Sequence, residues 1–281
     1  MILTRYLYSK ERLLLVLLKC LSLKLENESL IFAYELYFSG FESELWDCIW
    51  KHYYLYCHVL NPEYERFLKK QEKLSCNKND LTLIKKCIIE LIIRPYFYIG
   101  KSEYIELSLE ELIKTYKNPS FNPYNRVKII NIISRPIKNF EKEIVISRIL
   151  LLNNKPKQLK RQFYIEVDKN ECDKFETIEE PYCNSRYILI SVIKYNLLDY
   201  LSYEEIKNTE SIDKQDFIDN WIIYAYNCPL WKKRIEMYTG KIINGKLIFN
   251  DDDFEEKFWD KHDLDPDEQP IEIQIKLNYD K

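Results

Sequence analysis

Glycine is scarce in this chain of 281 residues, and its four glycines lie far apart, at Gly40, Gly100, Gly240 and Gly245. A phosphate-binding loop needs several glycines close together, because its backbone must approach the phosphate and adopt positive φ angles. The spacing therefore excludes a glycine-rich nucleotide-binding loop.

Histidine is scarce too, with three residues: His52, His58 and His262. Acid–base catalysis would have to rest on carboxylates, lysine or tyrosine, and no GxSxG, HExxH, GKS/T or kinase motif occurs. We expect a protein that is not an enzyme and that uses no cofactor. An enzyme without a recognised motif stays open as an alternative, and it would need a pocket with converging carboxylates.

Long apolar runs are absent as well. In Arg12–Leu25, the most apolar segment, the uninterrupted run extends only from Leu13 to Leu18. A membrane span needs about 20 such residues. We expect no membrane segment and no signal peptide.

The eight cysteines form no CxxC pair, and several lie within apolar runs. This pattern is typical of reduced, buried thiols in a cytosol-like compartment, and it does not suggest a disulfide framework.

The net charge is close to neutral, at −3. A protein that coats nucleic acid needs a strongly basic surface, so that class is not expected. Residues 250–281 nevertheless hold 12 acidic and four basic residues. We expect this acidic end to bind a basic surface of a partner or of the same protein.

The acidic residues assigned to partner binding are Asp263, Asp265, Asp267 and Glu268. Their spacing resembles a calcium loop, but Glu268 stands where such a loop needs glycine and Gln274 where it needs glutamate. We predict no calcium site.

Apolar residues recur at helical spacing through much of the chain. The first predicted helix has its apolar face at Leu14, Leu17, Leu18, Leu21 and Leu25. Further helices are predicted from Asn27, which would act as a cap, to Tyr37, and over Phe41–Leu60, Leu81–Ile93, Phe140–Leu152, Arg186–Leu201, Asp213–Asn227 and Pro229–Gly240, with a last helix capped by Asn250. The inner face of the third helix is predicted to comprise Phe41, Leu45, Cys48, Ile49, His52 and Val59.

Two segments predict strands. Asn244-Gly245 separates two short apolar runs, and this dipeptide favours the type I′ turn of a β-hairpin. Gln162–Asp168 is a second strand candidate. The predicted fold is mainly α, an irregular helical bundle or solenoid-like array with a small C-terminal β-hairpin. The predicted domains are residues 1–168, residues 185–262 and an acidic, extended tail over residues 263–281.

Cys48, His52, Cys57 and His58 form the chain's one Cys/His cluster. Cys48 and His52 lie four residues apart and would share a helix face, as zinc ligands do. That face is also apolar, so a buried, hydrogen-bonded pair is favoured over a metal site.

Basic residues next to aromatic ones suggest nucleic-acid contact in two places. The residues concerned are Lys157, Lys160, Arg161, Lys232, Lys233 and Arg234. Solvated basic surfaces are commoner, so RNA binding is the secondary interpretation.

Tyr8, Leu13 and Leu14 match the Tyr-x-x-x-x-Leu-apolar motif with which translation-initiation scaffolds bind the cap-binding protein. In that motif an amphipathic helix docks its Tyr and Leu on the partner. Leu14 also belongs to the apolar face assigned to the core, and both interpretations stay open.

Both ends of the chain are similar to a family of uncharacterised proteins from giant DNA viruses. The residues that carry the resemblance are Ala33–Phe41, Leu45-Trp46, Asn61-Pro62, Tyr224–Ile235 and Asp265–Pro270. The resemblance implies a setting, namely host cytoplasm, a viral factory or the virus particle, and it implies no activity.

These observations favour a non-enzymatic scaffold or interaction protein of a giant-virus cytoplasmic assembly. The alternative is a subunit of viral gene expression, either a translation-initiation scaffold or an RNA-binding accessory.

Overall fold

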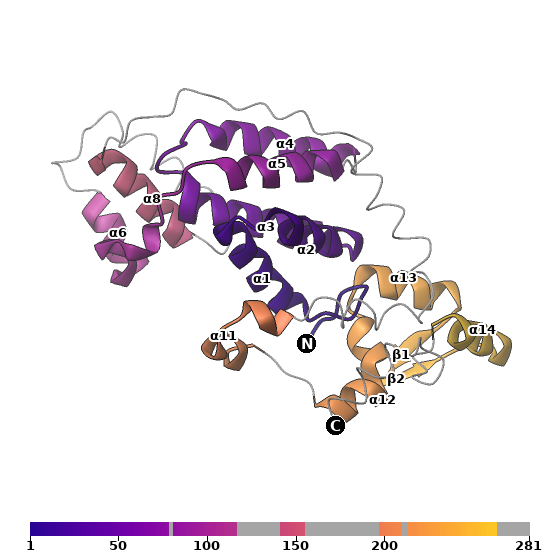
Figure 1. Cartoon of the computed structure of the whole chain (residues 1–281). Helices are drawn as coiled ribbons and strands as arrows, with labels where there is room; N and C mark the ends of the chain where they lie inside the picture. The colour runs from indigo at the N-terminus through magenta and orange to yellow at the C-terminus, as the bar shows by residue number, and fades with distance from the viewer. Residues whose placement is uncertain (79–80, 117–140, 155–196, 210–212, 263–281) are drawn as a thin grey trace. The chain divides into compact units, whose positions relative to one another are not determined.

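The computed structural model describes residues 1–78, 81–116, 141–154, 197–209 and 213–262. These ranges contain eleven α-helices and one two-stranded hairpin (Figure 1). The predicted fold class, mainly helical with a small C-terminal hairpin, is confirmed. Within the described ranges, no helix combines the length and the apolar character that crossing a membrane requires.

The chain divides into two compact units. The first contains Met1–Cys20, Asn27–Leu45 and Asp168–Lys281, and the second contains Leu21–Glu26 and Trp46–Val167. The first unit therefore combines both ends of the chain, and its boundaries fall inside helices. The predicted domain boundary between residues 168 and 185 lies outside the described residues and stays a prediction.

The N-terminal helices of the first unit are α1 (Lys10–Leu23), which extends into the second unit, and α2 (Glu26–Phe38). The short helix α11 (Tyr203–Lys207) begins with a capping box, in which Ser202 and Glu205 satisfy each other's backbone N–H groups. Its Glu205 carboxylate also pairs with Lys19 of α1 at 3.0 Å. This partly exposed pair links α11 to α1.

The C-terminal part of the first unit has an aromatic core. Helix α12 (Lys214–Ala225) is followed by α13 (Pro229–Met237), the hairpin, and α14 (Asp252–His262). The rings that meet there are Trp221, Trp231, Tyr238, Phe249, Phe258 and His262, with contacting centroids 5.0–6.2 Å apart. Pro229 occupies the first helical position of α13, as predicted.

The hairpin joins β1 (Lys241–Ile243) to β2 (Lys246–Ile248) in antiparallel register, beside α12 (Figure 1). Asn244 and Gly245 have φ angles of 51° and 74°. Positive φ at both central positions is what a type I′ turn requires, so the predicted turn is confirmed.

The second unit contains helices joined by turns and coil, and no strand, in its described residues. It contains the end of α3 (Glu42–His52), a π-helix (Tyr53–Cys57), α4 (Tyr64–Lys78), α5 (Leu81–Ile93), 3-10 turns at Ile99–Lys101 and Glu103–Glu106, α6 (Leu109–Tyr116) and α8 (Glu141–Asn154). Helices α4 and α5 lie side by side, and α6 packs on α8 (Figure 1). The bounds predicted for α5 are confirmed, as is the helix predicted over Phe140–Leu152.

Three local predictions need correction. The apolar face predicted for α1 is confirmed at Leu17 and Leu21, which are fully buried, but Leu14 and Leu18 are only half-buried. Leu13, Val16 and Cys20 are buried in their place. Asn27 lies inside α2 and does not cap it.

Asp251, one residue after the predicted cap, caps α14 instead: its side-chain Oδ1 accepts a hydrogen bond from the Asp253 N–H at 2.8 Å. The predicted strand at 162–168 and most of the predicted helix at 186–201 lie outside the described residues.

Candidate functional site

The N-terminal nine residues of the first unit form a closed loop. Leu3 and Ser9 pair as an isolated β-bridge, and the Thr4 N–H donates to the Tyr8 carbonyl oxygen at 2.8 Å. Leu7 has a φ of 62°, a conformation that costs a branched residue about 1 kcal/mol. The loop presents Arg5 to the helices around it.

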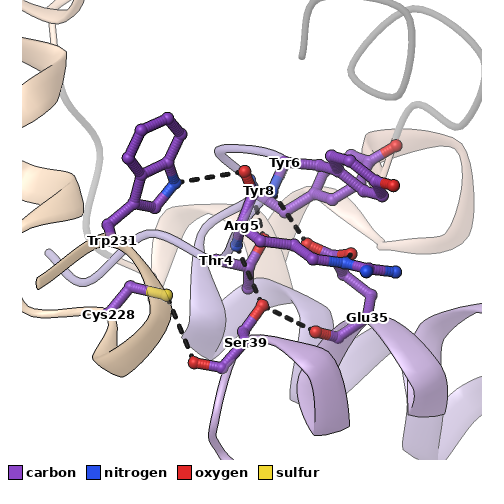
Figure 2. A network of polar contacts seen from close by, with 8 residues as sticks. All are labelled: Thr4, Arg5, Tyr6, Tyr8, Glu35, Ser39, Cys228 and Trp231. Atoms are coloured by element: carbon purple, nitrogen blue, oxygen red, sulfur yellow. Dashed lines mark hydrogen bonds and ion pairs between the residues drawn. The ribbon is translucent and has the colours of Figure 1, made fainter. Parts of the chain in front are cut away.

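Arg5 forms a buried ion pair with Glu35 of α2 (Figure 2). The Arg5 Nε donates to Glu35 Oε2 at 2.8 Å, and the Tyr6 N–H donates to Glu35 Oε1 at 3.0 Å. The guanidinium also lies over the rings of Tyr6 and Phe38, at 4.4 and 4.5 Å. Both charged side chains are at most 6 % exposed, so their mutual pairing offsets a large desolvation cost.

The same loop is joined to α13 from the far end of the sequence (Figure 2). The Trp231 Nε1–H donates to the Arg5 carbonyl oxygen at 3.1 Å. The Cys228 thiol donates to the Ser39 carbonyl oxygen at 3.2 Å, while the Ser39 Oγ accepts from Arg5 N at 2.9 Å. Gly40 follows with φ +87°, and a Cβ there would stand 2.7 Å from Pro229.

This network holds the first unit together and offers no reactive group. The Glu35 carboxylate accepts hydrogen bonds from the Arg5 side chain and the Tyr6 backbone N–H. Burial raises the pKa of the Cys228 thiol, so the nucleophilic thiolate is disfavoured. We assign the network a structural role, in which three segments distant in sequence are joined.

A second charged cluster lies in the second unit, around Glu65 of α4. Lys69 pairs with one carboxylate oxygen at 2.7 Å, Arg148 of α8 pairs with the other, and His58 Nε2 is 4.0 Å away. Burial alone would raise the pKa of Glu65, but Arg148 and Lys69 outweigh it and hold that pKa below its ordinary value. A carboxylate so stabilised is a poor general base, because it binds a proton weakly.

Cys48 and His52 of the predicted Cys/His cluster are buried, as the apolar face of α3 indicated, and Cys57 and His58 are buried too. Cys48, His52, Cys57 and His58 are each at most 7 % exposed. Burial raises the pKa of both thiols to about 12 and lowers the pKa of both histidines to about 3. No group of three potential metal ligands occurs in the described part of the chain.

The hydrogen bond that was expected in this cluster is absent at His52, where neither ring nitrogen has a partner. The ring of His52 stacks instead on Tyr56, with centroids 4.9 Å apart.

The predicted cap-binding motif is mostly covered. Tyr8 is 7 % exposed and Leu13 is fully buried, whereas Leu14 is half-buried. Leu13 and the N-terminal loop pack within the first unit. Docking through Tyr8 and Leu13 would require that loop to leave its network, so these residues offer no ready binding surface.

Of the six predicted basic residues, the structure describes three. Lys232 and Lys233 are exposed on α13, and the Arg234 guanidinium lies 4.8 Å from the centroid of the Trp231 ring. Lys157, Lys160 and Arg161 lie outside the described residues, as do Asp263, Asp265, Asp267 and Glu268.

One face of the hairpin is an exposed apolar surface of the first unit. We call it the outer face, and it consists of Lys241, Ile243, Lys246 and Ile248, all exposed. Ile243 and Ile248 are 48 % and 45 % exposed. They are diagonal neighbours in the register, each opposite a lysine. The sequence predicted the turn but not this exposed face. Side chains alternate between the two faces of a hairpin, and the sequence alone does not show which face packs against the rest of the unit.

No protein-family model, curated protein or solved structure matches the chain.

Proposed function

We propose that this protein is a non-catalytic, mainly helical interaction protein that binds a partner protein through the outer face of the β1–β2 hairpin. One observation carries the proposal: Ile243 and Ile248 are about half exposed and adjacent on a hairpin whose sheet has two strands among the described residues. Covering them would remove apolar surface from water, at about 25 cal/mol per Å².

The charge of the outer face specifies the kind of partner. Lys241 and Lys246 stand beside the two isoleucines. Lysines on an exposed strand oppose pairing with a second copy, because like charges would meet. The same lysines favour a partner surface that combines apolar and acidic side chains.

The proposed setting comes from the resemblance of the chain's ends to giant-virus proteins, which suggests a cytoplasmic viral assembly.

The test replaces both isoleucines with threonine, which is compatible with a strand but more polar. Affinity isolation of Ile243→Thr/Ile248→Thr from cells that make the protein should recover at least about tenfold less of its main partner, as loss of about 1.4 kcal/mol implies. The control is Leu198→Thr/Tyr203→Thr, which alters apolar residues that are 41 % and 76 % exposed elsewhere in the first unit. Equal recovery with both variants would refute the proposal.

A second function, RNA binding as an accessory of gene expression, has one supporting observation: Lys232 and Lys233 are exposed on α13. If they contact phosphates, replacing both with glutamine should weaken RNA binding at every sequence and lower its salt dependence by about two counterions. An unchanged salt dependence would exclude these two lysines.

A further inference from the structure

The hairpin has an open sheet edge as well as an outer face. In the described part of the chain its sheet consists of β1 and β2, so each strand has one side without a neighbouring strand. Helix α12 lies beside β2 (Figure 1), so β1 is the strand farther from that helix. The open side of β1 is therefore the edge at which a further strand can pair.

Ile242 is the residue whose backbone points out from this edge. Ile243 and Lys246 are the first and fourth residues of the type I′ turn, and the hydrogen bond of such a turn joins these two positions. Hydrogen-bonded and non-hydrogen-bonded pairs alternate along an antiparallel ladder, so Ile242 and Leu247 form a non-hydrogen-bonded pair. The backbone N–H and C=O of Ile242 therefore point away from β2.

The side chains of β1 specify what an added strand must carry. Lys241 and Ile243 flank Ile242, and both lie on the outer face. A strand paired with β1 would place its own side chains about 5 Å from theirs. An acidic residue matches Lys241, and an apolar residue matches Ile243. Because side chains alternate along a strand, these two partner residues stand two positions apart, and the residue between them lies on the half-buried side, with Ile242.

We propose that the partner protein contributes an extended segment, with an acidic and an apolar residue two positions apart, that pairs with β1 as an additional strand. The inference rests on the proposed function and deepens it, because it names the binding mode and the chemistry of the partner segment. Backbone hydrogen bonds to Ile242 supply affinity, and the neighbouring side chains supply selectivity. A second copy of β1, Lys-Ile-Ile, has no acidic residue to place beside Lys241.

Fluorescence anisotropy with the full chain tests this binding mode. The probe is a labelled peptide with blocked ends, Glu-Val-Ile-Val-Glu, which presents glutamate and isoleucine two positions apart in either strand direction. The matched peptide is Lys-Val-Ile-Val-Lys. The wild-type chain should bind the glutamate peptide about threefold more tightly, because opposite charges on neighbouring strands attract. Absence of binding to the glutamate peptide at protein concentrations up to about 1 mM would overturn the inference.

Ile242→Pro tests the edge itself. Proline removes an N–H that the hairpin does not use, so the hairpin should remain. Binding of the glutamate peptide should weaken at least about tenfold, because a peptide carbonyl oxygen loses its donor. The matched control is Leu247→Pro, which removes the N–H that points away from β1 and should leave binding within about twofold of the wild type. A chain with the α-hydroxy acid analogue of isoleucine in place of Ile242 lacks only the N–H, and it should show the same loss as Ile242→Pro.

A pair of lysine variants tests the position of the added strand. Lys241→Gln should abolish the preference for the glutamate peptide over the lysine peptide. Lys246→Gln removes the same charge from the same face but from β2, about 10 Å from a strand paired with β1, and should keep the preference. Loss of the preference in Lys246→Gln alone would place the peptide at β2 and contradict the inference.

Equal binding of the glutamate peptide by the wild type, Ile242→Pro and the α-hydroxy acid variant would overturn pairing at the edge. That result would leave the proposed function to the threonine variant, because side chains of the outer face can bind a partner without backbone pairing. Conversely, a tenfold loss in Ile242→Pro, together with unchanged partner recovery by Ile243→Thr/Ile248→Thr, would support pairing at the edge and refute the proposed function.

Discussion

The indole N–H of Trp231 donates to the carbonyl oxygen of Arg5 at 3.1 Å, across 226 residues of sequence. The bond joins the N-terminal loop to α13 and is buried. It explains how the first unit can combine both ends of the chain, since the loop that receives this bond also holds Glu35 of α2 through the Arg5 side chain.

Trp231→Phe tests this bond, because it keeps an aromatic ring but removes the donor. The Arg5 carbonyl oxygen would then be buried without this partner, so the free energy of unfolding should fall by about 1–3 kcal/mol. Urea unfolding followed by far-UV circular dichroism measures the change. Trp259→Phe is the control, since it makes the same substitution at a half-buried tryptophan. Equal losses in the two variants would show that the bond contributes nothing specific.

Glu35→Gln should destabilise the first unit strongly. It removes the countercharge of a guanidinium that is 6 % exposed, and breaking such a buried pair costs about 3–5 kcal/mol. Glu44→Gln breaks the Lys10–Glu44 pair, whose side chains are 20 % and 38 % exposed, and should cost less than about 1 kcal/mol. Thermal unfolding of both variants gives the comparison. Similar losses would mean that burial of the Arg5–Glu35 pair is unimportant.

Mild acid should destabilise the protein through its histidines. Burial lowers the pKa of His52, His58 and His262 from 6.5 to about 3 in the folded state. Below pH 6.5 the unfolded chain therefore binds protons that the folded chain does not. The free energy of unfolding should fall with decreasing pH by up to about 1.4 kcal/mol per pH unit for each histidine, until the pH approaches 3.

Urea midpoints between pH 7.5 and 5 measure this dependence. His52→Phe should reduce the slope by about a third, because one of three equivalent contributions is removed. If the pH dependence of the free energy of unfolding were the same in His52→Phe as in the wild type, the pKa of His52 would be equal in the folded and unfolded chains. That result would contradict this prediction.

Local signals in the sequence predicted local structure well. The helix over Leu81–Ile93 and the turn at Asn244-Gly245 follow from nearby residues alone, and both are confirmed. The buried face of α1 was predicted correctly at Leu17 and Leu21 but wrongly at Leu14 and Leu18, because leucines occur almost all round that helix. When apolar residues surround a helix, periodicity does not identify the side that tertiary contacts cover.

The functional surfaces were harder to predict, because they depend on contacts between distant residues. Arg5 and Glu35 lie 30 positions apart, and nothing local to either indicates the pair. On the hairpin, Ile242 and Ile243 are chemically identical, yet only Ile243 is exposed while Ile242 is half-buried. The packing of the first unit decides which of the two is available to a partner.

Site-specific photo-crosslinking tests the central claim most directly. A photoreactive amino acid would replace Ile243 in one full-length chain and Tyr203 in another, and adducts formed in cells that make the protein would be identified by mass spectrometry. Both positions are exposed in the first unit, but only Ile243 lies on the outer face. We predict that one partner protein is cross-linked at Ile243 through a segment of apolar and acidic residues, and not at Tyr203. Equal cross-linking of that partner at the two positions, or none at Ile243, would contradict the account.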